Sequence, residues 1–331
     1  MKVVFWLIVI SFLLTGCITN NNNDKEDWKE VTSGVSAELN GIDFINENEG
    51  WIAGIGVMLH TTDGGTTWTE QTVPTRANLS DVYFLNANNG WACGGEEIFK
   101  TTDGGDTWVL NESQNSNTLF RLTFTDADHG YAVGISNWPT PVGGLLQQTS
   151  DGGMNWESEY FVDPEDTLNG QQYIYQLNDV QFPTLNTGYI VGGSDWFLKT
   201  TDGGINWQDW SDNAPDNSCR GIFFINDNIG WTVGSAGSIH KTIDGGLTWT
   251  NQFNLNHTLY KVCFVDENIG WACGLDGYIV HTDDGGATWN VQYDENIASG
   301  GTTWKDIFFV NENLGFVVGT DGKIMRYIPN N

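Results

Sequence analysis

Residues 61–68 read TTDGGTTW, and this stretch returns along the chain with few changes. The other copies are TTDGGDTW from Thr101, TSDGGMNW from Thr149, TTDGGINW from Thr200, TIDGGLTW from Thr242 and TDDGGATW from Thr282. In such a turn the Asp carboxylate can accept backbone N–H groups, the glycines can adopt positive φ and the Trp can cover the hairpin. The repeat is therefore built for local geometry, and its spacing indicates the fold.

A second motif, a Gly followed by an aromatic residue, marks seven units. Its copies are Gly50-Trp51, Gly90-Trp91, Gly130-Tyr131, Gly188-Tyr189, Gly230-Trp231, Gly270-Trp271 and Gly315-Phe316. They lie 40 to 58 residues apart, and turn residues divide each unit into four short strand patterns. Because such units bury both sheet faces only against neighbours, they have to close into a ring. We predict an all-β fold, a seven-bladed β-propeller with four-stranded blades.

The last unit lacks the DGG motif and the strand that should follow it. A replacement is available at the other end of the chain, where residues 28–32 read WKEVT and match WTEQT at 68–72. We therefore expect the N-terminal strand to complete the last blade and close the ring.

The composition excludes two classes of protein. Of the 331 residues, 39% are hydrophobic and 13% aromatic, which excludes a disordered chain. The formal net charge of −29 repels a nucleic-acid backbone, so we expect no nucleic-acid partner. We also expect no cofactor and no metal, since no phosphate loop or zinc-ligand spacing is present. Asn-rich turns such as NENEG at 46–50 resemble parts of calcium loops, but hairpin turns favour the same residues.

The first residues form a separate segment. Lys2 precedes an apolar run over residues 3–14, which is too short to span a bilayer, and LTGC follows at 14–17. This end resembles the bacterial lipoprotein box; the alternative is an ordinary export signal with a chance Cys. The resemblance implies a signal peptide at 1–16, a lipidated Cys17 with a flexible tether at 17–27, and one propeller at 28–331. We expect an exported protein, lipid-anchored to a bacterial membrane and facing the periplasm or the cell surface.

The remaining cysteines have no metal-ligand spacing. They are Cys93, Cys219, Cys263 and Cys273. Cys263 and Cys273 fall on adjacent predicted strands, so a disulfide is an alternative, but we predict free, buried thiols that act as small apolar fillers.

The DGG repeat resembles the Asp-box of bacterial neuraminidase-type repeats. Over its whole mature length the chain also resembles the photosystem II assembly and stability factor family. Both resemblances imply that the box carboxylates are structural: Asp63, Asp103, Asp151, Asp202, Asp244 and Asp284. In that family a propeller face with an arginine patch binds a partner polypeptide, which implies a similar role here for Arg121 and Arg220.

Residues that the repeat does not explain gather on one predicted face. Loops from second to third strands, and from one blade to the next, emerge on the same side of a propeller, and blade three has long insertions there. We predict a partner-binding face that comprises Trp138, Trp196, Trp210, Trp304, Tyr173, Tyr175, Arg76, Arg121, Arg220, Lys261 and Lys305. Asp81, Asp179 and Asp306 occupy the repeat position of Arg121 and Lys261, so the charge there is mixed. The alternative is that the longer loops only cover themselves.

Two functional classes fit these patterns. The first is a non-enzymatic, monomeric, membrane-anchored interaction module that resembles an assembly factor and binds an exported or membrane polypeptide. The second is a carbohydrate-binding or sialidase-like glycoside hydrolase propeller, in which Arg76, Arg121 and Arg220 could bind a carboxylate. A sialidase also needs a Tyr nucleophile with a Glu and an Asp acid/base, and the chain shows no such set. We therefore favour the interaction module and predict no catalytic residues.

Overall fold

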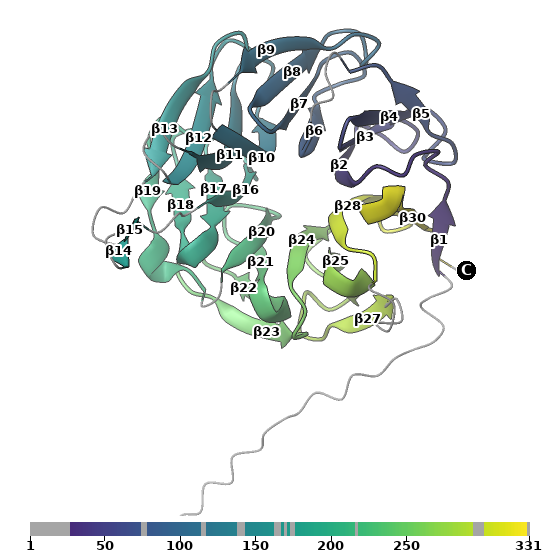
Figure 1. Ribbon diagram of the computed structural model, residues 1–331. Coiled ribbons are helices and arrows are strands. Elements are labelled where there is room, and N and C mark those ends of the chain that lie inside the picture. Colours follow the sequence, from purple (N-terminus) through teal and green to yellow (C-terminus); the bar gives the residue numbers. More distant parts are fainter. Residues whose placement is uncertain are drawn as a thin grey trace, which may run out of the picture.

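The strands are arranged as the blades of a propeller around a central axis (Figure 1). The computed structural model describes residues 27–73, 78–113, 117–137, 143–161, 167–168, 171–172, 176–215, 218–293 and 301–329. Within these ranges the strands form seven four-stranded antiparallel sheets, one for each predicted unit. No helix of the described part is long and apolar enough to cross a membrane. The predicted seven-bladed propeller is confirmed.

Each of the first six blades is one continuous meander, with its first strand nearest the axis. Blade one comprises β2 (Leu39–Phe44), β3 (Gly50–Gly54), β4 (Val57–Thr61) and β5 (Thr69–Gln71). Blade two comprises β6 (Asp81–Phe84), β7 (Gly90–Gly94), β8 (Glu97–Thr101) and β9 (Val109–Ser113). Blade three comprises β10 (Asn117–Phe124), β11 (Gly130–Ser136), β12 (Gly143–Thr149) and β13 (Glu157–Phe161).

The next three blades repeat this order. Blade four comprises β16 (Leu177–Gln181), β17 (Gly188–Gly192), β18 (Phe197–Thr200) and β19 (Gln208–Asp209). Blade five comprises β20 (Cys219–Phe224), β21 (Gly230–Gly234), β22 (Ser238–Thr242) and β23 (Thr250–Asn254). Blade six comprises β24 (Leu259–Phe264), β25 (Gly270–Gly274), β26 (Ile279–Thr282) and β27 (Asn290–Tyr293). Short 3-10 turns lie at η2 (Gly193–Asp195), η3 (Ser211–Asn213), η4 (Ser235–Gly237), η5 (Leu275–Gly277) and η7 (Thr320–Gly322).

Blade seven is built from both ends of the chain, as predicted. It comprises β28 (Trp304–Asn311), β29 (Leu314–Gly319) and β30 (Ile324–Tyr327), with β1 (Trp28–Val31) as its outer strand. The pairing of β1 with β30 is antiparallel and runs from Trp28 opposite Tyr327 to Val31 opposite Ile324. Trp28 is 4% exposed, and its ring lies 5.2 Å from that of Tyr327. This contact locks the ring.

The Gly-aromatic motif explains how neighbouring blades pack. The Trp51 ring stacks on Phe84 of the next blade with centroids 3.5 Å apart. Gly50 has to lack a side chain, because a Cβ there would lie 2.5 Å from the Phe44 ring. Equivalent stacks recur between later blades, for example Trp231 on Phe264 at 3.6 Å. The repeated motif is therefore the apolar contact that holds blade to blade.

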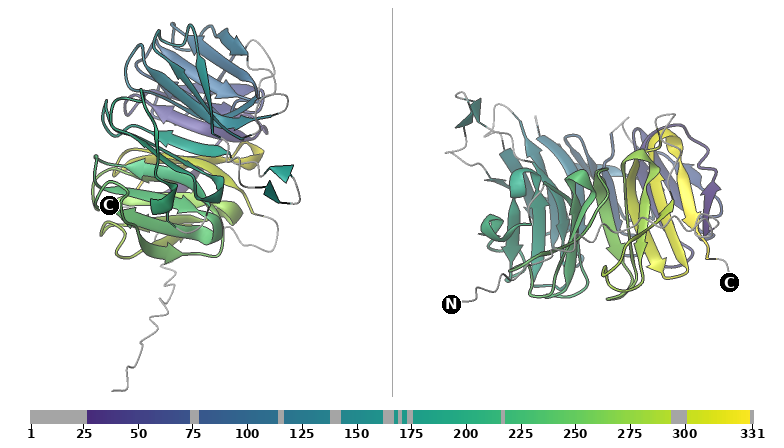
Figure 2. Two further views of the ribbon diagram at one scale, coloured as in Figure 1. Left: turned by 90° about the vertical axis from the view of Figure 1, so that its left-hand side faces the viewer. Right: turned by 90° about the horizontal axis from the view of Figure 1, so that it is seen from below.

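The ring has two distinct faces. The Asp-box turns join third to fourth strands and lie on one face, which we call the box face; connections between blades lie on the other. β1 begins on the box face, since Trp28 is the counterpart of the box residue Trp68, and Ile328 there donates to the Asp27 carbonyl at 2.8 Å. A hairpin of β14 (Thr167–Leu168) and β15 (Gln171–Gln172) belongs to the connection from blade three to blade four. Figure 2 shows it on one side of the disc and the end of β30 on the other.

The described cysteines are all buried and unpaired, as predicted. The strand register does not place Cys263 and Cys273 opposite each other. Cys263 lies opposite Trp271, and Cys273 lies opposite Lys261. Burial raises the pKa of the Cys263 thiol to about 11, so it stays protonated and unreactive.

Candidate functional site

The innermost strands of the blades surround the propeller axis (Figure 1), and most of them have a β-bulge near their start, at one end of the axis. Register shifts occur at the same place in β2, β10, β16, β20, β24 and β28, each leaving one residue without a cross-strand partner. We call these residues, with their blade-two counterpart, the mouth ring: Asn40, Ser80, Phe120, Asn178, Arg220, Tyr260 and Lys305. They lie on the face opposite the box face, where the sequence predicts the partner surface.

Some residues of the mouth ring form hydrogen bonds to the next blade, and others are partly exposed. The Asn40 amide donates to the Leu79 carbonyl of the next blade at 2.8 Å, and Asn178 does the same to Cys219 at 2.6 Å. Phe120 and Tyr260 are half-buried. The sequence analysis missed these two aromatics, although each directly precedes a basic residue that it selected.

Three carboxylates one position deeper tie adjacent blades together. Asp81 accepts the Leu122 backbone N–H at 2.9 Å, Asp179 accepts that of Ile222 at 3.0 Å, and Asp306 accepts that of Ile42 at 3.2 Å. Each bond runs from one innermost strand to the next. These aspartates therefore act in closing the ring.

Arg121 lies among these carboxylates and joins residues of three blades near the axis. Its Nη1 is 3.1 Å from Asp81 Oδ1 and 3.0 Å from Asp306 Oδ2, while Nη2 donates to the Lys305 carbonyl at 3.3 Å. Its side chain is only 12% exposed. Burial raises the pKa of Asp81 to about 6, while the charge of Arg121 opposes that rise. Arg121 thus links blades two, three and seven, and the structure does not place it as an open anchor for a partner.

Two further basic residues are also engaged. Lys261 Nζ lies 2.9 and 2.8 Å from the two carboxylate oxygens of Asp179, and Lys305 Nζ lies 3.0 Å from Glu38 Oε1. The Lys305 pair is about one-third exposed and therefore weak. Lys261 belongs to the blade-locking charges, whereas Lys305 stays available at the rim.

Arg220 differs from the other basic residues of the mouth. Within the described residues it makes no ion pair or hydrogen bond, and its buried Nε has no acceptor. A buried guanidinium donor without a partner is costly, because desolvation of the N–H group is not compensated. The Arg220 side chain is half-buried and carries a charge that no described residue neutralises, so its guanidinium is available to a carbonyl or carboxylate from outside the chain.

The Trp residues predicted for the binding face lie in different surroundings in the structure. Trp304 is fully buried in the core of blades six and seven and donates from Nε1 to the Gly277 carbonyl at 3.0 Å, so its predicted place on a binding surface is wrong. Trp210 packs at the outer edge of blade four, where Lys199 Nζ lies 4.3 Å from its ring centroid. Trp196 is half-buried and meets Phe161 edge-on at 5.8 Å. Trp196 lies at the end of blade four from which the blade connections leave, and Trp210 lies at the same end, since its backbone N–H donates to the Phe197 carbonyl at 2.8 Å.

Several predicted residues lie outside the described ranges. They are Cys17, Arg76, Trp138, Tyr173 and Tyr175.

The Asp-box carboxylates are occupied within their own turns. Asp63 accepts the Thr67 backbone N–H at 2.9 Å and the Thr67 hydroxyl at 2.7 Å, and these bonds lower the pKa of Asp63 to about 2. Gly65 N–H donates to the Thr61 hydroxyl at 3.0 Å. The other boxes repeat this pattern, as at Asp151 with Asn155. These carboxylates hold the turn in place. No group of three or more His, Cys, Asp or Glu side chains that could hold a metal occurs among the described residues.

Comparison with known proteins identifies relatives of the same architecture. The family model described as photosynthesis system II assembly factor YCF48 matches residues 20–112, 110–213, 167–259, 213–290 and 251–328. The structure of YCF48 bound to D1 peptide is 20% identical, with a TM-score of 0.72 over 92% of this chain and 97% of that chain. YCF48 from Cyanidioschyzon merolae is 21% identical, with a TM-score of 0.70 over 92% and 99%. An ancestral GH74 enzyme is 16% identical with a TM-score of 0.66, but the matched region covers 89% of this chain and only 45% of the enzyme. No curated protein sequence matches the chain. Since the family model matches nearly the whole propeller, the chain belongs to the family of photosynthesis system II assembly factor YCF48.

Proposed function

We propose that this chain is a non-enzymatic, membrane-anchored propeller that binds an exported or membrane polypeptide through the mouth ring, in the manner of an assembly factor. Two comparisons support a polypeptide partner. The family description names an assembly factor, and a relative with the same fold has been solved with a D1 peptide.

The observation that carries the proposal is the state of Arg220. It is half-buried and has no ion-pair partner among the described residues, and it shares the mouth ring with the half-buried aromatics Phe120 and Tyr260. Arginine and aromatic side chains are the types that most often dominate the energy of protein interfaces. A peptide carbonyl or carboxylate would supply the acceptor that Arg220 lacks.

The arrangement of Arg121 supports the non-enzymatic part of the proposal. A carboxylate-binding triad needs its guanidinium groups free to meet a substrate. Arg121 is instead held by Asp81 and Asp306 at 3.1 and 3.0 Å. The glycosidase alternative thus loses one of the three arginines that were proposed to bind a substrate carboxylate.

A lipid at Cys17 would anchor the ring through residues 17–27. These residues lead into β1, which begins on the box face. Substitution Cys17→Ser should move the protein from the membrane pellet to the soluble fraction and abolish incorporation of labelled fatty acid. Retention of Cys17→Ser in the pellet would contradict the anchor and leave the mouth proposal intact.

The partner surface can be tested by affinity capture from detergent-solubilised envelope, followed by mass spectrometry. Arg220→Ala combined with Tyr260→Ala should reduce recovery of the captured polypeptide at least tenfold. Asn88→Ala combined with Asn228→Ala changes turns on the box face and serves as the matched control. Loss of the partner in the control pair, with retention in the Arg220 and Tyr260 pair, would overturn the assignment.

A further inference from the structure

A repeated contact fills the seam between the outer part of one blade and the box turn of the next. In blades two, four and five the residue just before the box is a lysine, and its ammonium reaches across the seam to the next blade. Lys100 Nζ lies 2.8 Å from the Gly152 carbonyl and 5.4 Å from the Trp91 ring centroid. Lys199 and Lys241 repeat the contact with Gly245 at 2.9 Å and with Gly285 at 2.8 Å. The seam is therefore a place where this chain itself binds an ammonium group.

A second donor from the outer strand usually joins this lysine or its counterpart. The Gln71 amide donates to the Gly104 carbonyl at 3.0 Å, and the Gln252 amide donates to Gly285 at 3.5 Å. The Asn111 amide donates to the carbonyl of Gly153, the second glycine of its box. The glycine carbonyls of the box turns thus normally receive donors from the blade before.

The seam between blades three and four departs from both rules. Gln148 stands where the lysine is expected, and Glu159 stands where Gln71 and Gln252 place their amides. Glu157, directly opposite Gln148 on β13, adds a second carboxylate. Within the described residues the Gly203 carbonyl accepts a bond from the Tyr131 hydroxyl alone.

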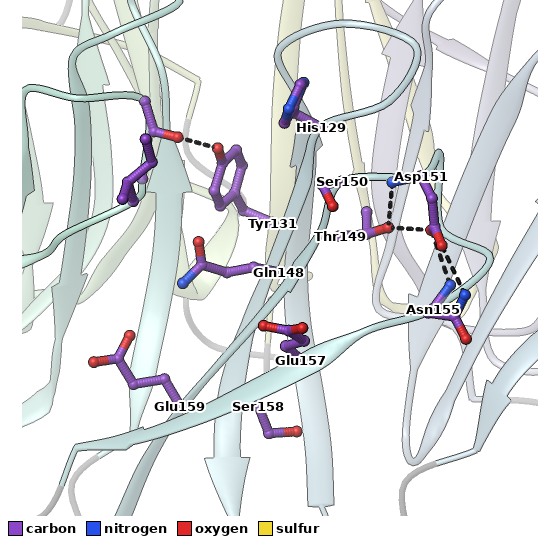
Figure 3. A pocket seen from close by; sticks show the side chains of 13 residues that line it. His129, Tyr131, Gln148, Thr149, Ser150, Asp151, Asn155, Glu157, Ser158 and Glu159 are labelled. Atoms are coloured by element: carbon purple, nitrogen blue, oxygen red, sulfur yellow. Dashed lines mark hydrogen bonds between the residues drawn. The ribbon is translucent and has the colours of Figure 1, made fainter.

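These exchanges leave an open pocket of about 530 Å³ (Figure 3). Gln148, Glu157 and Glu159 line it from blade three, and Gly203, Gly204 and Ile205 line it from blade four. Partial burial raises the pKa of Glu159, as expected for a carboxylate without a cationic partner. Compared with the equivalent seams, this pocket has more hydrogen-bond acceptors, and it lacks the side-chain donors that fill those seams.

We propose that this pocket binds a primary ammonium group, either a lysine side chain of a polypeptide or a free polyamine. The ammonium takes the place of the missing lysine: it donates to the Gly203 carbonyl and pairs with Glu159 and Glu157. The alkyl chain of the ligand lies along Ile205, which is 80% exposed. The site is on the box face, separate from the mouth ring, and does not depend on the proposed function.

The test is calorimetric titration of the complete chain in detergent with Nα-acetyl-lysine N-methylamide, with cadaverine, and with the Nε-acetylated lysine derivative. The ammonium compounds should bind, and the acetylated compound, which has the same stem without the charge, should not. Binding of cadaverine alone would assign the site to free polyamines, and binding of the lysine amide would assign it to polypeptides. Absence of binding by both, or equal binding of the acetylated compound, would overturn the proposal.

Variants separate this pocket from general attraction to an acidic protein. Gln148→Lys supplies the missing ammonium from within the chain, as in the neighbouring seams, and should weaken ligand binding at least tenfold. Glu159→Gln should weaken it severalfold while leaving the seam otherwise intact. Glu70→Gln removes an exposed carboxylate from the outer strand of blade one and should have no effect. Unchanged affinity in both pocket variants, or an equal loss in Glu70→Gln, would refute the site.

Discussion

Replacing Arg121 with Met tests whether this residue holds the ring together. Its guanidinium is 12% exposed and lies 3.1 and 3.0 Å from the carboxylates of Asp81 and Asp306, which are 10% and 6% exposed. Removing one partner of a buried ion pair costs about 3 to 5 kcal/mol, because the other charge stays buried. Asp81 can escape this cost by taking up a proton, since burial already raises its pKa to about 6. We therefore expect Arg121→Met to lose about 3 kcal/mol of unfolding free energy at pH 7, the lower end of that range.

The assay is urea unfolding followed by tryptophan fluorescence. The loss should shrink at about pH 5, where Asp81 carries a proton and no longer needs a partner. Arg220→Met is the matched control, since this arginine has no ion pair in the described structure, and it should change stability by about 1 kcal/mol or less. A change of less than about 1 kcal/mol for Arg121→Met at pH 7 would refute the locking role.

Three other outcomes follow from buried groups. Deleting residues 28–32 removes Trp28 from Tyr327 and should cost about 5 kcal/mol or more of unfolding free energy, whereas deleting residues 20–26 should change little; equal melting temperatures would exclude closure through β1. Burial raises the pKa of Asp43 to about 7, so between about pH 4 and 7 the folded state binds more protons than the unfolded chain and stability falls as pH rises. Lowering the pH from about 7.5 to 5.5 should therefore stabilise the wild type by up to about 2 kcal/mol more than Asp43→Asn in urea titrations. Burial holds the pKa of Cys93 well above its usual range, so a thiol reagent should label it only as the protein unfolds, and rapid labelling of the native protein would contradict this.

The repeat was enough to predict the fold because each unit of the sequence shows the strand pattern of one blade. The Gly-aromatic motif and the box fix two positions in every unit, and the register between them follows from the alternation of side chains. Closure through residues 28–32 followed from one missing box. None of these steps needed a contact between distant blades.

The mouth could be predicted only in part, because it depends on a bulge and on contacts across the ring. Arg121 and Lys261 share one repeat position, but their partners Asp306 and Asp179 come from other blades, so the sequence did not show that these charges are paired. Trp304 was predicted on the surface because of its residue type. Its repeat position is the one that Leu39 fills in blade one, and the residue at this position is buried in each of the seven blades. At that position the place within the blade determines that the side chain is buried, whatever the residue type.

The same reasoning separates the two proposed sites in space. The mouth ring lies on the face of the blade connections, whereas the blade-three pocket lies on the box face, where β1 receives the N-terminal segment. The blades between them are joined by rigid ladders and by carboxylate bonds around the axis, so neither site has an evident moving element through which to affect the other. We therefore expect a ligand in the pocket to leave the affinity of the mouth unchanged.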